Sequence, residues 1–91
     1  MASTPRWELL GINVVNGTLL VQDLLFNKPR SFHVPMLTNA KVMDGFAYVA
    51  TRQGRVMQID LQTAKRKFVE HDASGAAIQF PEDTPQLELQ I

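Results

Sequence analysis

The sequence contains no cysteine and no long hydrophobic run, and these two absences remove several classes of protein. Without cysteine there is no disulfide framework, no thiolate zinc site and no cysteine nucleophile. No apolar run approaches the ~18 residues that a membrane-spanning helix needs. Residues 1–7 also lack the charged-then-apolar pattern of a secretory signal peptide. We therefore expect a cytoplasmic protein with no membrane partner.

Glycine and proline are present in modest numbers, five each, which excludes collagen-like and low-complexity chains. A hydrophobic fraction of 45% is too high for a disordered chain. A chain of 91 residues has room for one hydrophobic core of modest size. We expect residues 1–91 to form a single β domain, for the reasons given below.

Basic and acidic side chains balance at nine each, but they are distributed unevenly. Residues 1–69 hold all nine basic side chains and four acidic ones, whereas the segment 70–91 holds five acidic side chains and no basic one. Opposite charges attract over about 8 Å at physiological salt, so we expect the acidic C-terminal segment 70–91 to pair with its own sheet or a neighbouring one. The alternative is that it competes with an anionic ligand for a basic surface. A net charge near zero also favours self-association.

Turn signals divide the chain into short segments of β-type composition. Asn16-Gly17 is typical of a two-residue hairpin turn, and Asn27-Lys28-Pro29-Arg30 is expected to break a strand because proline cannot donate to a ladder. Such short connections allow antiparallel neighbours and exclude parallel crossovers. The predicted strands are 10–14, 18–26, 31–34, 41–43, 46–51, 55–61 and 65–70.

The sequence therefore predicts an all-β fold, an antiparallel meander of five to seven strands rolled into a small barrel or an open sheet. Residues 4–10 begin either as one short helix, with Thr4 as its N-cap and Pro5 in its first turn, or as a strand. The expected core comprises Leu10, Ile12, Val14, Leu19, Val21, Tyr48, Met57, Ile59, Leu61 and Phe68.

The last six residues alternate strictly between polar and apolar side chains. Leu87, Leu89 and Ile91 would share one face of a strand, and that face needs a partner. These three residues are our candidates for self-association, by closing the chain's own sheet or by adding to the edge of another subunit.

Two internal echoes are visible. Residues 14–21 and 42–49 both read apolar-apolar-(Asn/Asp)-Gly followed by a strand. Asp23-Leu24 and Asp60-Leu61 are each followed by Lys, Arg, Phe and Val. The echoes indicate either turn chemistry common to all hairpins or a degenerate hairpin repeat.

Residues 46–65 run from a Tyr48-Val49 strand through a glycine turn to an Ile59-Asp60 strand end and Thr63-Ala64-Lys65. This segment resembles the inner hairpins of a quinoprotein-type β-propeller blade. Ala64 stands where such blades have glycine. A propeller needs about four blades or more, so the resemblance implies a β-meander and no cofactor or activity.

No phosphate-binding, dinucleotide-binding, nucleophile-elbow or zinc-protease motif occurs in the sequence. His33 lies in a predicted strand, and in an extended chain His71 points away from Glu70 and Asp72, which does not favour chelation. We therefore predict no catalytic, cofactor-binding or metal-binding residues, and no enzyme. A small hydrolase or ligand-binding barrel is kept as the last alternative.

Binding of single-stranded nucleic acid is the first alternative function. Small β-barrels bind single strands with basic grooves and stacking aromatic rings. The rings would come from Phe46, Tyr48 and Phe68, whereas turns at 53–54 and 63–64 would divide the cations between opposite ends of a sheet. The candidate contacts are Arg52, Arg55, Lys65, Arg66 and Lys67. The preferred prediction is a non-enzymatic binding or structural module that forms a homo-oligomer or binds a protein partner.

Overall fold

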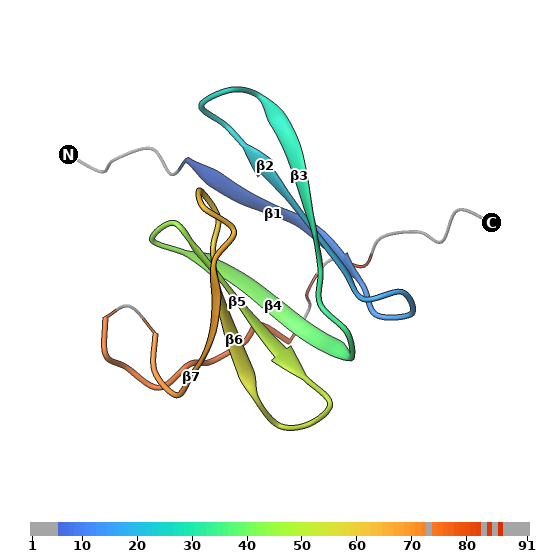
Figure 1. The fold of residues 1–91 in the computed structure, drawn as a ribbon, viewed down its shortest axis with the longest axis vertical. Helices are drawn as coiled ribbons and strands as arrows, with labels where there is room; N and C mark the ends of the chain where they lie inside the picture. The colour runs from blue at the N-terminus through green and yellow to red at the C-terminus, as the bar shows by residue number, and fades with distance from the viewer. Residues whose placement is uncertain (1–5, 73, 83, 85, 87–91) are drawn as a thin grey trace.

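The structure is a computed structural model that describes residues 6–72, 74–82, 84 and 86. In these residues the chain forms seven antiparallel strands in two sheets and no helix (Figure 1). No helix in the described ranges is therefore long and apolar enough to cross a membrane. The strands are β1 (Trp7–Asn13), β2 (Thr18–Asp23), β3 (Lys28–His33), β4 (Leu37–Met43), β5 (Phe46–Thr51), β6 (Val56–Asp60) and β7 (Arg66–Val69).

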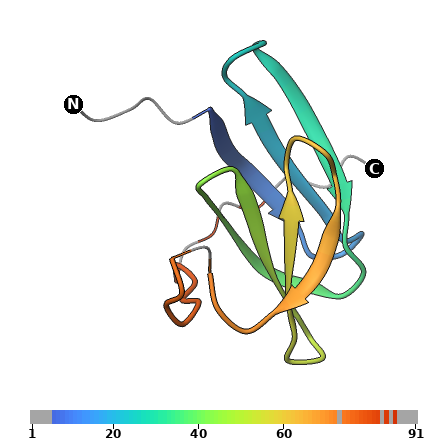
Figure 2. The ribbon, with the colours of Figure 1, turned by 60° about the vertical axis from the view of Figure 1, so that its left-hand side comes forward.

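Both sheets are meanders in which each strand pairs with the next along the chain. The first sheet has the order β1-β2-β3 and the second has the order β4-β5-β6-β7. The predicted all-β antiparallel meander is thus confirmed, but the strands do not close into a barrel. The two sheets pack against each other (Figure 2), and β1 and β4 are the strands that come closest between them.

The core lies between the two sheets. Of the ten predicted core residues, six are buried, and Val14 and Met57 pack at its margin. The buried cluster consists of Trp7, Ile12, Leu19, Val21, Phe32, Val34, Leu37, Ala40, Ala47, Val49, Ile59 and Leu61. Tyr48 is also fully buried, but it lies on the other face of the second sheet, beside Gln58.

Two predicted core residues are exposed, and each has a local cause. The register between β1 and β2 shifts between Leu9 and Gly11, which makes Leu10 the extra residue of a bulge and leaves it 37% exposed. Phe68 is 50% exposed because β7 is the edge strand of the four-stranded sheet and no further strand covers it.

Two predictions of local structure are wrong, and one open choice is decided. Of the helix and the strand considered for residues 4–10, the strand is observed from Trp7 onward, where Trp7 pairs with Asp23. Residues 24–26 form a turn, although they were expected to continue the second strand. Pro29 lies inside β3, which accommodates it because β3 is an edge strand and one of its sides needs no ladder donor.

The segment after β7 crosses the outer face of the second sheet towards β4 (Figure 1). At the β4 edge, Nδ2 of Asn39 donates to the Pro81 carbonyl at 2.9 Å, and the Thr84 hydroxyl donates to Oδ1 of Asn39. Gln86 then forms a parallel bridge with Ile12 of β1. The proposed self-association residues Leu87, Leu89 and Ile91 lie outside the described residues.

Candidate functional site

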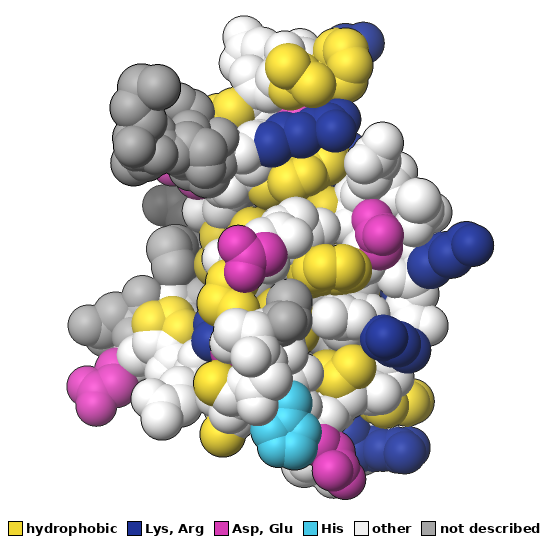
Figure 3. Space-filling model, turned by 90° about the vertical axis from the view of Figure 1, so that its left-hand side faces the viewer, with side chains coloured by type: hydrophobic (Ala, Val, Ile, Leu, Met, Phe, Trp, Pro, Cys, Tyr) yellow, Lys and Arg dark blue, Asp and Glu magenta, His cyan; other side chains and the backbone are white. Residues whose placement is uncertain are grey.

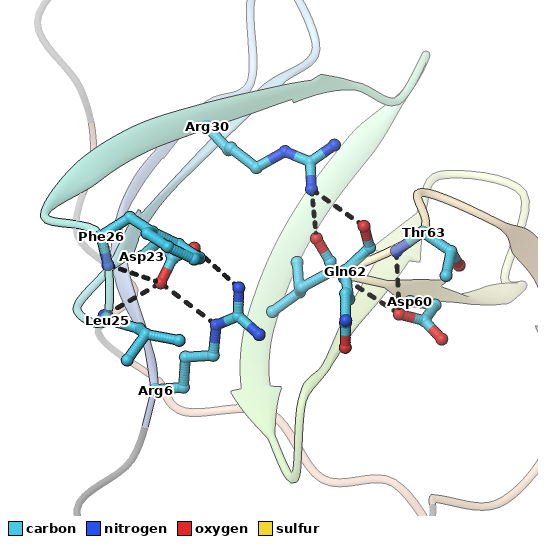
Figure 4. Close-up of polar contacts among 9 residues, drawn as sticks. Arg6, Asp23, Leu25, Phe26, Arg30, Asp60, Gln62 and Thr63 are labelled. Carbon is cyan, nitrogen blue, oxygen red and sulfur yellow. Dashed lines mark hydrogen bonds and ion pairs between the residues drawn. The ribbon is translucent and has the colours of Figure 1, made fainter.

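The turn between β2 and β3 is held by the carboxylate of Asp23. Its Oδ1 accepts the backbone N–H groups of Leu25 at 3.0 Å and Phe26 at 3.4 Å. Asn27 completes the turn in the left-handed region, with φ of 54°. Behind the turn, Nε and Nη2 of Arg6 donate to the two carboxylate oxygens of Asp23 at 3.2 and 3.1 Å (Figure 4). The backbone of this turn is therefore fixed by side-chain hydrogen bonds.

This fixed turn exposes three consecutive large apolar side chains. Leu24 is 41% exposed, Leu25 66% and Phe26 63%. We call these three residues the apolar tip. The turn forms one end of the longest axis of the molecule (Figure 1), and Figure 3 shows hydrophobic side chains at that end with Lys and Arg side chains beside them. The Arg6 guanidinium lies 5.4 Å from the centre of the Phe26 ring.

The charges behind the tip stabilise one another. Hydrogen bonds from Arg6, with smaller contributions from the Leu25 and Phe26 amides, lower the pKa of Asp23, and burial opposes them. The same hydrogen bond raises the pKa of Arg6. Lys28 follows the turn at the start of β3 and is exposed. The apolar tip is therefore followed by an exposed cation, Lys28, while the charge of Asp23 is neutralised by Arg6.

Two other turns repeat the hydrogen bonding of the Asp23 turn. Oδ1 of Asn13 accepts the amides two and three residues later, at 3.0 and 3.2 Å. Oδ1 of Asp60 does the same with Gln62 and Thr63, at 2.9 and 3.2 Å (Figure 4). Ala64 takes the left-handed position of the Asp60 turn, with φ of 66°. The Asp-Leu echo in the sequence, Asp23-Leu24 and Asp60-Leu61, marks this shared turn. It was the sequence signal that indicated a turn at residues 24–26, where a strand was predicted.

A hollow of about 670 Å³ lies around the β5–β6 turn and the end of β7, at the end of the molecule opposite the tip (Figure 1). We call it the end hollow. Its lining is mixed: apolar side chains from Val56, Phe68, Val69, Ala77 and Ile78 lie beside Glu70 and Arg55, whose guanidinium lies 4.0 Å from the centre of the Phe68 ring. The lining residues are Gly54, Arg55, Val56, Phe68, Val69, Glu70, Ala77 and Ile78.

A second hollow, of about 520 Å³, lies beside the β6–β7 turn. We call it the basic hollow. Three of the five predicted nucleic-acid contacts meet there, whereas Arg52 and Arg55 lie at the β5–β6 turn at the other end of β6. The lining residues are Phe46, Gln58, Asp60, Lys65, Arg66 and Lys67.

Two arginines connect β3 to the region of β6 and β7. Nη1 of Arg30 donates to the carbonyls of Leu61 at 2.6 Å and Gln62 at 3.3 Å (Figure 4). Nη1 of Arg66 donates to the His33 carbonyl at 2.6 Å. Both guanidinium groups therefore hold the two sheets together on the side away from β1 and β4.

Within the described ranges, no three His, Asp or Glu side chains gather as the ligands of a metal ion would. Fold and surface together define the chain as a small all-β domain of two antiparallel meanders, with an apolar turn at one end and two hollows on the second sheet. No family model, curated protein or solved structure matches it.

Proposed function

We propose that this protein is a non-enzymatic binding module that self-associates, with the apolar tip as its docking element. The observation that carries the proposal is the exposure of Leu24, Leu25 and Phe26 side by side at the end of the molecule. Single exposed apolar residues are common on protein surfaces, whereas contiguous ones mark interaction sites. Burying them against a partner would gain about 25 cal/mol for each Å² removed from water.

The Asp60 turn supports a binding role for these side chains. It has the same backbone hydrogen bonds, yet it carries Gln62 and Thr63 where the tip carries Leu25 and Phe26. A polar pair therefore satisfies the turn equally well. The apolar identity of the tip is not required by the turn, and binding to a partner is the reason that we assign to it.

The edge strands are poorer candidates for the contact. β3 presents Lys28, Pro29 and Arg30, and β7 presents Arg66 and Lys67. Proline and basic side chains at a sheet edge oppose the addition of another strand. Association through the side chains of the tip needs no strand addition at either edge.

The end hollow of a second copy is the receptor that we assign to the tip. The apolar side chains of its lining suit leucine and phenylalanine, and its volume of about 670 Å³ leaves room for the three side chains. Glu70 at the hollow would face Lys28 beside the tip, which pairs opposite charges. Because tip and hollow lie at opposite ends of one molecule, the contact is head-to-tail, and assemblies grow with concentration unless they close into a ring.

Sedimentation velocity over a range of protein concentrations tests the proposal. The wild-type chain is expected to form progressively larger species, and the double variant Leu25→Ser/Phe26→Ser is expected to stay monomeric. Val15→Ser is the matched control, since Val15 is 73% exposed at the equivalent place in the Asn13 turn, where half-buried Val14 and polar Asn16 flank it in the chain. Its assembly should equal that of the wild type. Circular dichroism establishes that all variants are folded.

Two outcomes contradict the proposal. A wild-type chain that stays monomeric at every concentration refutes self-association. A chain ended after Gln86 keeps all described residues and lacks Leu87, Leu89 and Ile91. If this truncation abolishes assembly while the tip variant assembles normally, the C-terminal alternation forms the contact and the tip does not.

A further inference from the structure

The basic hollow lies on the outer face of the four-stranded sheet, and the strand register defines its floor. Phe46 pairs with Asp60, and Gln58 lies between Tyr48 and Lys67 in one row across β5, β6 and β7. Lys41 on β4 continues this row beyond Tyr48. The row therefore runs from a lysine on one edge strand to a lysine on the other, across three strand spacings or about 14 Å.

An aromatic ring on this face packs beside a second ring on the same strand. Phe46 is partly exposed, and its ring centre lies 6.4 Å from that of Tyr48, with 52° between the ring planes. Tyr48 is fully buried, and its hydroxyl accepts a hydrogen bond from Nε2 of Gln58 at 3.0 Å. The support of Tyr48 gives Phe46 a fixed orientation, so its exposed face can stack against a flat ligand.

Cations outnumber anions around this ring. Lys65 and Lys67 are exposed, whereas the Arg66 guanidinium is directed to the His33 carbonyl of β3. The one carboxylate that lines the hollow belongs to Asp60, which already accepts the amides of Gln62 and Thr63. The hollow thus has a net positive charge and is open to an anionic ligand.

We infer that the basic hollow binds single-stranded nucleic acid. An unpaired base would stack on Phe46 while Lys65 and Lys67 contact its phosphates. The volume of about 520 Å³ falls within the range of about 300–1,000 Å³ that is usual for small-molecule sites. A stacking ring next to lysines is the combination by which single strands are bound without sequence preference. This inference is independent of self-association, because it uses a different face of the molecule.

Fluorescence anisotropy with a labelled 15-nucleotide oligothymidine at low salt tests the inference. The double variant Lys65→Gln/Lys67→Gln is expected to bind at least tenfold more weakly. The slope of log affinity against log salt concentration should fall in magnitude by about 1.4, or about 0.7 for each lost phosphate contact. Phe46→Leu keeps an apolar side chain but removes the stacking plane, so it should weaken binding roughly tenfold while the protein stays folded by circular dichroism.

The matched control is Arg52→Gln, which removes one positive charge at the other end of β6 and is compared with the single variant Lys67→Gln. This control should bind within about twofold of the wild type. Equal losses in the two single variants would mean that attraction comes from the whole charge of the chain and would overturn the hollow as a site. Absence of binding at low salt, or equal affinity for a 15-base-pair duplex, would also overturn the inference.

Discussion

At the residue scale, three turns depend on a single side-chain oxygen at the last residue of a strand. Asn13, Asp23 and Asp60 each accept two backbone amides, and a residue with positive φ follows four positions later. Sequence analysis placed the first of these turns correctly from Asn16-Gly17, but its prediction of a two-residue turn is wrong. Four residues separate Asn13 from Thr18, and of the pair Asn16-Gly17 only Gly17 has positive φ. Sequence analysis also extended a strand over residues 24–26, because the left-handed residue of the second turn is asparagine and apolar side chains before it are typical of a strand.

Gly17 is the left-handed residue with the strictest requirement. Its φ is 74°, and a Cβ added there would lie 2.7 Å from the Val34 carbonyl oxygen. The Gly17 carbonyl also accepts the Val34 N–H at 2.7 Å, so the two backbones cannot separate without losing that bond. Gly17→Ala should lower the free energy of unfolding by roughly 3 kcal/mol, about 1–2 of it from the backbone conformation alone. Urea denaturation followed by circular dichroism measures this change.

Gly54→Ala is the control for this substitution. Gly54 has a φ of 76°, but no atom lies within 4 Å of the place of its Cβ. Only the cost of the left-handed backbone conformation remains, so Gly54→Ala should lower the free energy of unfolding by about 1–2 kcal/mol. Equal losses in the two variants would contradict the close approach of Gly17 to Val34.

Asp23 makes the free energy of unfolding depend on pH in the acid range. Its pKa is lowered in the folded protein, chiefly by the hydrogen bonds from Arg6, relative to the ordinary value of 3.8. A carboxylate with a lowered pKa contributes stability at higher pH, and this contribution is lost as the pH falls through 3.8 to the folded-state value. We expect the free energy of unfolding to decrease over this range, and Asp23→Asn to show a smaller decrease. Urea denaturation at a series of pH values from about 6 to about 2 measures both.

Asp72→Asn serves as the comparison for the acid titration. The pKa of Asp72 is also lowered, first by the Ser74 hydroxyl, and Asp72 does not contact Arg6. This variant should retain the part of the acid dependence that comes from Asp23. If Asp23→Asn has the same pH profile as the wild type, the ion pair with Arg6 does not stabilise the fold.

At the scale of elements, the strands were predictable and their ends were less so. All seven segments predicted before residue 71 overlap an observed strand, because alternation and turn residues are local signals. The bulge at Leu10 was not predictable, since it depends on the register with β2. The place of Pro29 depends on β3 being an edge, which is a property of the sheet and not of the segment.

Arg30 and Arg66 connect elements that no strand pairing joins. Each donates to a backbone carbonyl across the gap between β3 and the β6–β7 region. Because both groups are partly in contact with water, we expect Arg30→Met and Arg66→Met each to lower the free energy of unfolding by about 1 kcal/mol. The double variant should lose less than the sum, by about 0.5 kcal/mol or more, because both bonds hold the same gap closed. Urea denaturation of the wild type, the two single variants and the double variant completes this double-mutant cycle.

Arg52→Met is the control for these arginine variants. The Arg52 side chain is exposed, so its removal should change stability by no more than about 0.5 kcal/mol. Strict additivity of Arg30→Met and Arg66→Met would show that the two arginines act independently.

At the scale of the whole molecule, the division into two sheets could not be predicted from the local pattern of apolar and turn residues. The connection between β3 and β4 is short, with Met36 at a φ of 65°, and nothing in its composition marks a change of sheet. The basic hollow was partly predictable, because Lys65, Arg66 and Lys67 are neighbours in the sequence. Phe46 joins them only through the pairing of β5 with β6, which is a long-range contact that residue patterns do not specify.

The bridge between Ile12 and Gln86 joins the first strand to one of the last residues of the chain. During synthesis each meander can pair as soon as its own hairpins have left the ribosome, since those contacts are local. The bridge and the Asn39 contacts with residues 81 and 84 can form only after residues 81–86 have been synthesised. Until then a nascent chain would carry two paired sheets that lack these contacts along β1 and β4, so a ribosome stalled before residue 81 would hold a species that still needs protection from aggregation.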